Sequence, residues 1–259
     1  MNALLDTWHM AQRHIRALLR QPWWIVVTLI QPIIWLVLFG GLFETMENTP
    51  GWPEGVSFLE FITPGVIVMT AFFSAGWGGM SMIEDLNRGI IDRFLVSPAK
   101  RSSIIMGALL QSALSVAIQS VIVLLLALIM GASYPNGVGG VVLLILIAAL
   151  VGFGFGAFSN GLALIIRKEE SLIAMMQFLL LPLTFMAAAF IPLDLAPDWI
   201  ASVAKFNPVN WGIEAGRSAA MDPSPDWGLI TSRVGLLIVF GALMATFATR
   251  AFRSYQRTV

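Results

Sequence analysis

The sequence has no cysteine, only two histidines and few charged residues, which make up 12% of the chain. The absence of cysteine excludes a disulfide framework, a thiolate metal site and a cysteine nucleophile. Soluble domains carry about a quarter charged residues and less than half apolar ones. Because 58% of this chain is hydrophobic, water is not its main solvent, and we expect an integral membrane protein.

Sequence patterns of catalysis and nucleotide binding are also missing. No Gly-x-x-x-x-Gly-Lys-Ser/Thr phosphate loop occurs, and the glycine-rich stretch from 152 to 161 lies inside an apolar run rather than after a strand. His9 and His14 lie in the N-terminal segment, and no His-Glu-x-x-His or Gly-x-Ser-x-Gly pattern is present. We therefore expect a chain that is not an enzyme and holds no metal or cofactor of its own.

Six apolar runs have about the length that a helix needs to cross a bilayer. The fold class that they predict is an all-α membrane protein of six spans over 23–249, with approximate limits 23–43, 61–83, 104–130, 141–166, 172–190 and 228–249. Residues 1–22 alternate apolar and basic positions at helical spacing, which predicts an amphipathic helix on the membrane surface. Residues 250–259 form a short tail. The segment 191–227 is too polar for a span and is broken by prolines, so we expect interfacial or re-entrant helices there.

The distribution of Lys and Arg predicts the orientation, since short cytoplasmic loops collect positive charge. If the N-terminus is cytoplasmic, the inner segments hold twelve of the fifteen Lys and Arg residues: Arg13, Arg16, Arg20, Arg88, Arg93, Lys100, Arg101, Arg167, Lys168, Arg250, Arg253 and Arg257. The outer segments are rich in Asp and Glu instead. Both termini are then cytoplasmic. Arg233 lies near the outer end of the last span, where we expect it to pair with Glu214 or Asp226.

The segment from about 84 to 97 between the second and third spans is the most informative one. Glu84 and Arg88 stand four residues apart, as do Arg88 and Asp92, and Ile83, Leu86, Ile90 and Phe94 would share one face of a helix. A membrane-bound helix with charges of both signs on its free face is suited to dock a soluble partner. The alternative is a solvated connector helix.

Two separated parts of the sequence resemble the ABC type-2 permeases, a family of drug, antibiotic and polysaccharide exporters. The first part resembles that family's first cytoplasmic loop and contains Glu84, Asp85, Arg88, Gly89, Asp92, Arg93, Leu95 and Pro98. The second resembles the outer segment before the last span and contains Pro192, Asn207, Pro208, Glu214 and Arg217. Within the family, the chain is most similar to the daunorubicin-resistance type.

The resemblance implies a permease in the bacterial cytoplasmic membrane that exports an amphipathic or hydrophobic substrate, either a drug, a lipid or a lipid-linked glycan. A second permease copy would form a homodimer, and two separate ATPase subunits would bind ATP and Mg²⁺ and dock on the 84–97 coupling helix. A second, lesser contact would involve Arg167, Lys168, Glu169 and Glu170. Spans one and five would line the substrate path through Trp35, Phe39, Met175, Phe178, Phe185 and Met186. No nucleic-acid partner is expected.

Two other function classes compete with this interpretation. A non-transporting membrane assembly or anchoring protein would use the same loop to recruit a soluble partner, and a membrane enzyme would need polar catalytic clusters that the sequence lacks. Apolar path walls suit drugs, lipids and lipid-linked glycans alike, so the residues do not identify the substrate.

The orientation is testable with reporter fusions. Fusions after Arg20, Lys100, Lys168 and Arg257 should report a cytoplasmic location, and fusions near Glu54 and Pro223 an external one, because the basic residues concentrate on one side. An external signal at Lys100 would overturn the predicted topology.

Overall fold

The structure is a computed structural model that describes residues 29–53, 55–90 and 101–256, for 101–108, 111 and 256 the backbone alone. Over these residues the chain is helical and contains no strand. Its helices run in the order η1 (Trp35–Phe39), α3 (Gly40–Leu42), η2 (Glu44–Asn48), α4 (Phe58–Gly76), α5 (Gly79–Asn87), α7 (Arg101–Ile129), α8 (Gly137–Ile166), α9 (Glu169–Phe185), η3 (Leu193–Leu195), α10 (Asp198–Ala204), α11 (Pro208–Met221) and α12 (Trp227–Gln256). The predicted helix over 1–22 lies outside the described residues.

Four of the described helical stretches are long and apolar enough to cross a membrane: Phe58–Asn87, Ser112–Ile129, Gly137–Ile166 and Trp227–Tyr255. They correspond to the second, third, fourth and sixth predicted spans. Residues Leu29–Leu42 form a shorter apolar helix, and α9 is 17 residues long. The structure therefore shows an all-helical membrane protein, and six spans stay a prediction.

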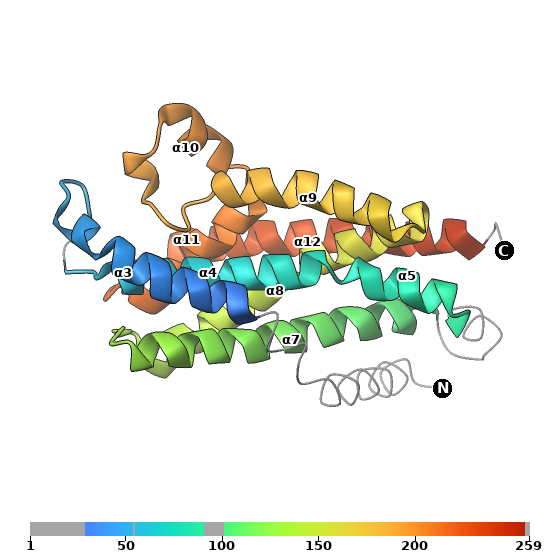
Figure 1. Cartoon of the computed structure of the whole chain (residues 1–259), viewed down its shortest axis with the longest axis horizontal. Helices are drawn as coiled ribbons and strands as arrows, with labels where there is room; N and C mark the ends of the chain where they lie inside the picture. The colour runs from blue at the N-terminus through green and yellow to red at the C-terminus, as the bar shows by residue number, and fades with distance from the viewer. Residues whose placement is uncertain (1–28, 54, 91–100, 257–259) are drawn as a thin grey trace.

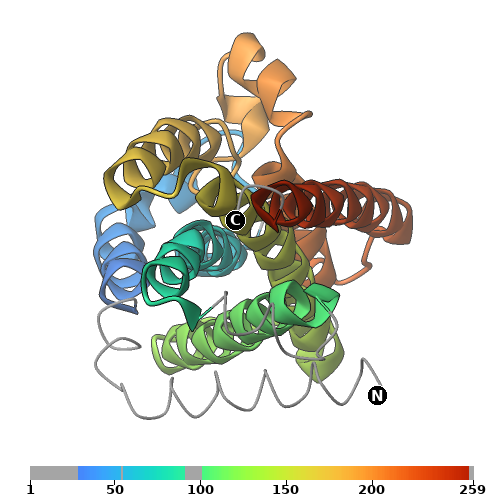
Figure 2. The same cartoon turned by 90° about the vertical axis from the view of Figure 1, so that its right-hand side faces the viewer.

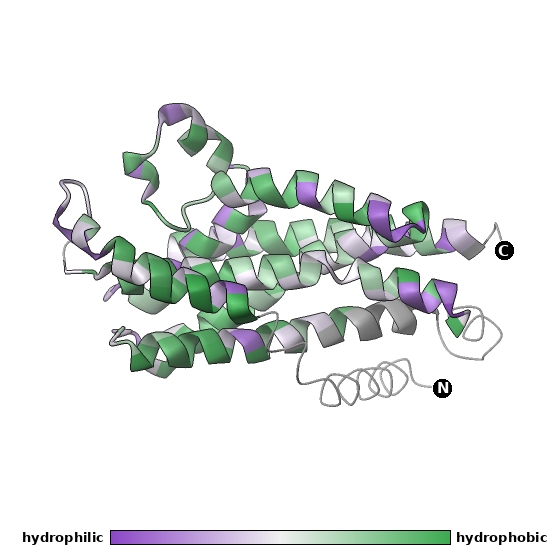
Figure 3. Ribbon diagram, in the orientation of Figure 1, coloured by the Kyte–Doolittle hydropathy of each residue, from purple (hydrophilic) through white to green (hydrophobic). Residues whose placement is uncertain are grey.

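The helices form a bundle arranged around α8, which packs against α4, α7, α11 and α12 (Figures 1 and 2). Apolar residues cover the sides of the bundle and hydrophilic ones gather towards its two ends (Figure 3). The α8 glycines allow this close packing, since a Cβ at Gly154 would lie 2.6 Å from the Phe240 ring. The absence of a side chain at Gly154 thus lets α12 approach α8 closely.

The two ends of the bundle differ in charge. At one end, hereafter the basic end, lie the last turn of α5, the α8–α9 connection and the C-terminal part of α12 (Figure 1), which carry Arg88, Arg167, Lys168, Arg250 and Arg253. At the other end, the acidic end, lie η2, η3 and the starts of α10 and α12, which carry Glu44, Glu47, Asp194, Asp198 and Asp226. The segregation that the sequence predicts is thus present along the bundle.

The second predicted span begins earlier than expected and is not one continuous helix. It starts at Phe58 because Ser57 and Glu60 form a reciprocal capping box that satisfies two backbone donors. It breaks at Trp77 and Gly78, between α4 and α5. The sequence prediction of a single span over 61–83 did not include this break.

The segment between α9 and α12 contains the short helices that the prolines predict. η3 and α10 project from the acidic end, whereas α11 packs against α4, α8 and α12 inside the bundle (Figure 1). Gly65 of α4 faces the backbone of Ala189, near the start of this segment. The chain can approach α4 there because Gly65 has no side chain.

Adding one methyl group at Gly65 should destabilise the protein. The new carbon would lie 2.7 Å from the Ala189 carbonyl oxygen and 2.9 Å from its Cα, so the backbone must shift. Overpacking of this kind costs about 1 to 3 kcal/mol, and Gly65→Ala should lower the thermal unfolding midpoint of the purified protein in detergent. Gly235→Ala on α12 is the control, because no atom lies within 4 Å of its added carbon. Equal midpoints for the two variants would contradict this packing.

Candidate functional site

The last turn of α5 presents a charged pair at the basic end. Arg88 Nη2 lies 2.5 Å from Glu84 Oε1, and the two side chains are 66% and 53% exposed. Met82 and Ile83 are buried on the opposite side of the helix and hold it against the bundle. The predicted i,i+4 pair of Glu84 and Arg88 is confirmed, and it faces outward, where a soluble protein can reach it.

The predicted coupling helix is interrupted within its first half. α5 ends at Asn87, and Gly89 has φ 64°, a left-handed conformation that favours glycine. The prediction of one uninterrupted helix over 84–97 is therefore wrong at Arg88 and Gly89, and Ile83 does not share a continuous helix face with Ile90. Asp85 is half-buried. Asp92, Arg93, Leu95 and Pro98 lie outside the described residues, as does the predicted Arg88–Asp92 pair.

The connection between α8 and α9 forms a second charged turn at the same end. Arg167 has φ 56° and ends α8, while Glu169 and Glu170 open α9, where the helix dipole favours negative charge. The Arg167 guanidinium lies over the Tyr255 ring of α12, 4.6 Å from its centre. Arg167, Lys168, Glu169 and Glu170 are all exposed. The turn is thus fixed to α12 and open to solvent.

At the acidic end, two asparagines of α11 bind the end of α9. Asn207 caps α11 by accepting from Val209 N, and its Nδ2 donates to the carbonyl oxygens of Leu183 at 2.8 Å and Met186 at 2.9 Å. Asn210 Oδ1 accepts from Ala188 N at 2.9 Å. Pro208 starts α11, where its missing N–H has no helical partner. These amides satisfy backbone groups at the end of α9 that its own helix leaves free.

Arg217 extends this cluster to α4. Its Nη2 donates to the carbonyl oxygens of Ala188 at 2.7 Å and Phe61 at 3.2 Å, and its guanidinium carbon lies 3.7 Å from the centre of the Phe61 ring. The outer polar cluster, consisting of Asn207, Asn210, Glu214, Arg217 and Arg233, therefore joins four helices: α4, α9, α11 and α12.

The cluster also contains an ion pair. Arg233 Nε of α12 lies 2.7 Å from Glu214 Oε2, and the other Glu214 oxygen accepts from Asn210 Nδ2 at 2.8 Å. Arg233 therefore pairs with Glu214, one of the two partners predicted for it. Asn210 was missed in the sequence, although it lies three residues after Asn207 and so on the same side of α11. Pro192 is buried at the start of η3, away from these contacts.

The six residues predicted to line a path are not brought together. Trp35 and Phe39 pack inward on Phe190, with ring centres 5.6 Å and 5.1 Å apart. Phe178 and Phe185 of α9 are 84% and 74% exposed, Met175 is exposed beside them, and Met186 is partly buried after the helix end. Trp35 and Phe39 therefore pack inward while Phe178 and Phe185 are exposed, and a substrate path lined by the six residues stays a prediction.

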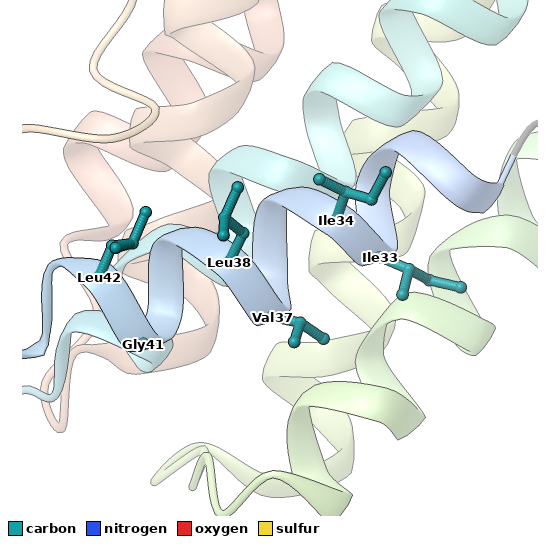
Figure 4. Close-up of a pocket in the computed structure, with 6 residues that line it drawn as sticks. All are labelled: Ile33, Ile34, Val37, Leu38, Gly41 and Leu42. Atoms are coloured by element: carbon teal, nitrogen blue, oxygen red, sulfur yellow. The ribbon is translucent and has the colours of Figure 1, made fainter.

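The helix Leu29–Leu42 instead exposes another face, which forms a shallow apolar groove. Figure 4 shows its lining side chains, all from this one helix: Ile33, Ile34, Val37, Leu38, Gly41 and Leu42. In Figure 2 this helix (blue) and α9 (gold) lie on the same side of the bundle. Two apolar helix faces are thus exposed on one side. Within 29–53, 55–90 and 101–256, no group of three His, Asp or Glu residues is placed to hold a metal ion.

Known proteins resemble most of the chain. The family model described as "ABC-2 type transporter" matches residues 6–221. The ycf38 protein of Porphyra purpurea is 31% identical over 227 residues, covering 86% of this chain and 76% of its own length. The daunorubicin resistance ABC transporter permease protein DrrB1 of Streptomyces coeruleorubidus is 26% identical over 91% of this chain and 80% of its own. The inner membrane transport permease YadH of Escherichia coli K12 is 25% identical, with 83% of each chain covered.

Removing the Asn207 amide should loosen the end of α9. Asn207→Ala leaves the carbonyls of Leu183 and Met186 without this donor, and an unsatisfied buried polar group costs about 1 to 3 kcal/mol. The thermal unfolding midpoint should fall, and the amides of residues 183–188 should exchange hydrogen faster. Asn87→Ala serves as control because Asn87 is exposed at the end of α5. Unchanged exchange at 183–188 in Asn207→Ala would show that the amide does not hold α9.

Proposed function

Because the chain belongs to the ABC-2 type transporter family, we propose that it is the membrane permease of an exporter and that its ATPase is a separate polypeptide. The charged pair at the end of α5 carries this proposal. Glu84 and Arg88 are exposed at the basic end, while buried Met82 and Ile83 fix the same short helix to the bundle. A rigidly seated helix with exposed charges of both signs suits a soluble partner that pushes on the membrane bundle.

The partner that fits this surface is a pair of ATPase subunits, which bind ATP and Mg²⁺. The coupling contact consists of Glu84 and Arg88 with the chain that follows, and the exposed turn Arg167–Glu170 supplies a second contact at the same end (Figure 1). The permease itself contributes no nucleotide-binding loop, since the sequence has no Gly-x-x-x-x-Gly-Lys-Ser/Thr pattern. It is therefore a transport subunit without its own catalytic site.

A second copy of the permease covers the apolar side formed by Leu29–Leu42 and α9. Val37, Leu38 and Phe178 are at least 49% exposed there, and the apolar side chains of Figure 4 offer contacts for another helix. Lipid covers a smooth apolar helix equally well, but a groove is filled best by fixed side chains that pack into it. The groove thus favours a homodimer with this side at its centre.

The substrate moves along that side and is amphipathic or hydrophobic. Phe178, Phe185 and Met175 of α9 offer aromatic rings and a flexible thioether, which adapt to varied apolar molecules. A relative named for daunorubicin resistance supports a drug of this character, and a lipid or lipid-linked glycan has the same apolar requirement. Trp35 and Phe39 contribute indirectly to this side, by packing on Phe190.

The permease lies in a bacterial cytoplasmic membrane with its basic end inside. Arg88, Arg167, Lys168, Arg250 and Arg253 share that end, as the positive-inside rule requires of cytoplasmic segments. A relative named as an inner membrane permease supports this location. ATP binding then draws the two ATPase subunits together beneath the dimer. It shifts the population from an inward-open or laterally open form to an outward-open one.

Reversing the charge of Arg88 tests the docking surface. Arg88→Glu places like charges at 84 and 88, which costs the helix only about 0.2 to 0.5 kcal/mol, so membrane insertion should survive. Loss at the docked interface should be larger, on the order of 1 to 3 kcal/mol, and should reduce copurified ATPase about tenfold or more. The ATPase to use is a nucleotide-binding subunit of the same organism that copurifies with the wild-type chain.

Arg253→Glu is the charge-matched control, because Arg253 is exposed at the same end on α12. It should copurify the ATPase like the wild type. If Arg88→Glu does so too, the α5 end is a solvated connector and the docking proposal is wrong. If the ATPase binds but no substrate stimulates its hydrolysis, the chain is an anchoring protein instead.

A further inference from the structure

The break between α4 and α5 frees two backbone groups in the buried middle of the bundle. In a continuous helix, Gly79 N would donate to Ala75 O and Met80 N to Gly76 O. Here Ala75 O accepts from Gly78 N and Met80 N donates to Trp77 O. Gly79 N and Gly76 O are therefore left without their helical partners. Gly76 and Gly79 are buried, so water does not replace these partners.

One hydroxyl of α8 satisfies both groups. Ser159 Oγ donates to Gly76 O at 2.5 Å and accepts from Gly79 N at 3.0 Å, and the Ser159 side chain is fully buried. The contact requires a glycine at 79, because a Cβ there would lie 2.5 Å from the Ser159 carbonyl oxygen. The break is thus bridged by a side chain of the neighbouring helix α8.

The bridged break lies between the docking surface and the outer polar cluster. On one side, α5 carries Glu84 and Arg88 to the basic end. On the other side, α4 carries Phe61, whose carbonyl accepts from Arg217, and Gly65, which lies against Ala189. A change in the angle between α4 and α5 at Trp77–Gly78 therefore alters how a movement of α5 is transmitted to the end of α9.

We infer that Trp77–Gly78 is a hinge between α5 and α4, and that Ser159 is the positioning residue that holds it in the angle seen here. This inference rests on the proposed docking of an ATPase on α5. Breaking the two hydrogen bonds leaves the helices and their apolar packing in place but lets α5 move independently of α4. Ser159 thereby transmits movement of the docking surface to the acidic end.

Hydrogen exchange of the purified full chain tests the hinge without any ATPase. In Ser159→Ala, exchange of the amides of 79–87 should quicken by roughly threefold per lost bond and on the order of tenfold for both. Exchange in 58–72 and 137–155 should stay unchanged. Ser120→Ala is the control, since Ser120 is equally buried on α7 and its hydroxyl makes no hydrogen bond within the described part of the chain. Ser159→Cys, which keeps a weak donor and acceptor, should fall between the wild type and Ser159→Ala, and it decides the question if Ser159→Ala does not fold.

A second measurement on the complex with the ATPase separates coupling from mere stability. A non-hydrolysable ATP analogue should change exchange at residues 183–188 in the wild type, and Ser159→Ala should reduce that change several-fold while the ATPase still copurifies. Unchanged exchange at 79–87, or an equal rise in Ser120→Ala, would overturn the hinge. A failure of the wild-type chain to bind the ATPase would refute the proposed function. The hinge would then be tested by hydrogen exchange of the purified chain alone.

Discussion

The hydrogen-bonding demand of the peptide backbone in hydrocarbon is the constraint on which this structure depends. A helix meets that demand within itself, and any break inside the bundle must be repaired by a neighbour. At the middle of the second span the repair is a single serine, Ser159. At the end of α9 it is a set of side chains from α11, in which Asn207 and Arg217 donate to three carbonyls. Ser159, Asn207 and Arg217 thus bond backbone groups where α4–α5 and the end of α9 are interrupted.

The bundle has two regions that differ in how closely their helices pack. Around α8, glycines and rings pack closely and fix α4, α8 and α12 to each other. On the side of Leu29–Leu42 and α9, large apolar side chains are exposed, and α9 buries only Leu172, Met176, Leu180 and Thr184. The outer polar cluster holds α9 at its end, while much of its length has no covering within the described chain. A transporter needs this combination of a fixed core and a side that can rearrange around cargo.

Sequence reasoning predicted what depends on hydropathy and charge, and missed what depends on local geometry. Apolar runs located the long helices, and the Lys and Arg distribution separated the two ends, because both signals are sums over many residues. The pairing of Arg233 was predictable since a partly buried cation near a span end has few possible partners. The break at Trp77–Gly78 was not predictable, because the backbone N–H that it leaves unpaired bonds to Ser159, eighty residues away in the sequence. The helical spacing of apolar residues continues past Gly89, yet the positive φ of Gly89 ends the helix. Trp35 packs inward on Phe190, a contact that the spacing of residues in the sequence does not reveal.

The central claim is that this chain is the membrane half of an ATP-driven exporter, powered by another polypeptide. The most direct test is ATP hydrolysis in lipid nanodiscs by the purified chain alone and by the same chain copurified with its cognate ATPase. The account predicts no hydrolysis by the lone chain, and hydrolysis by a complex of two permeases and two ATPases. Sustained hydrolysis by the lone chain, or a chain that retains no ATPase under conditions where it stays folded, would contradict the account.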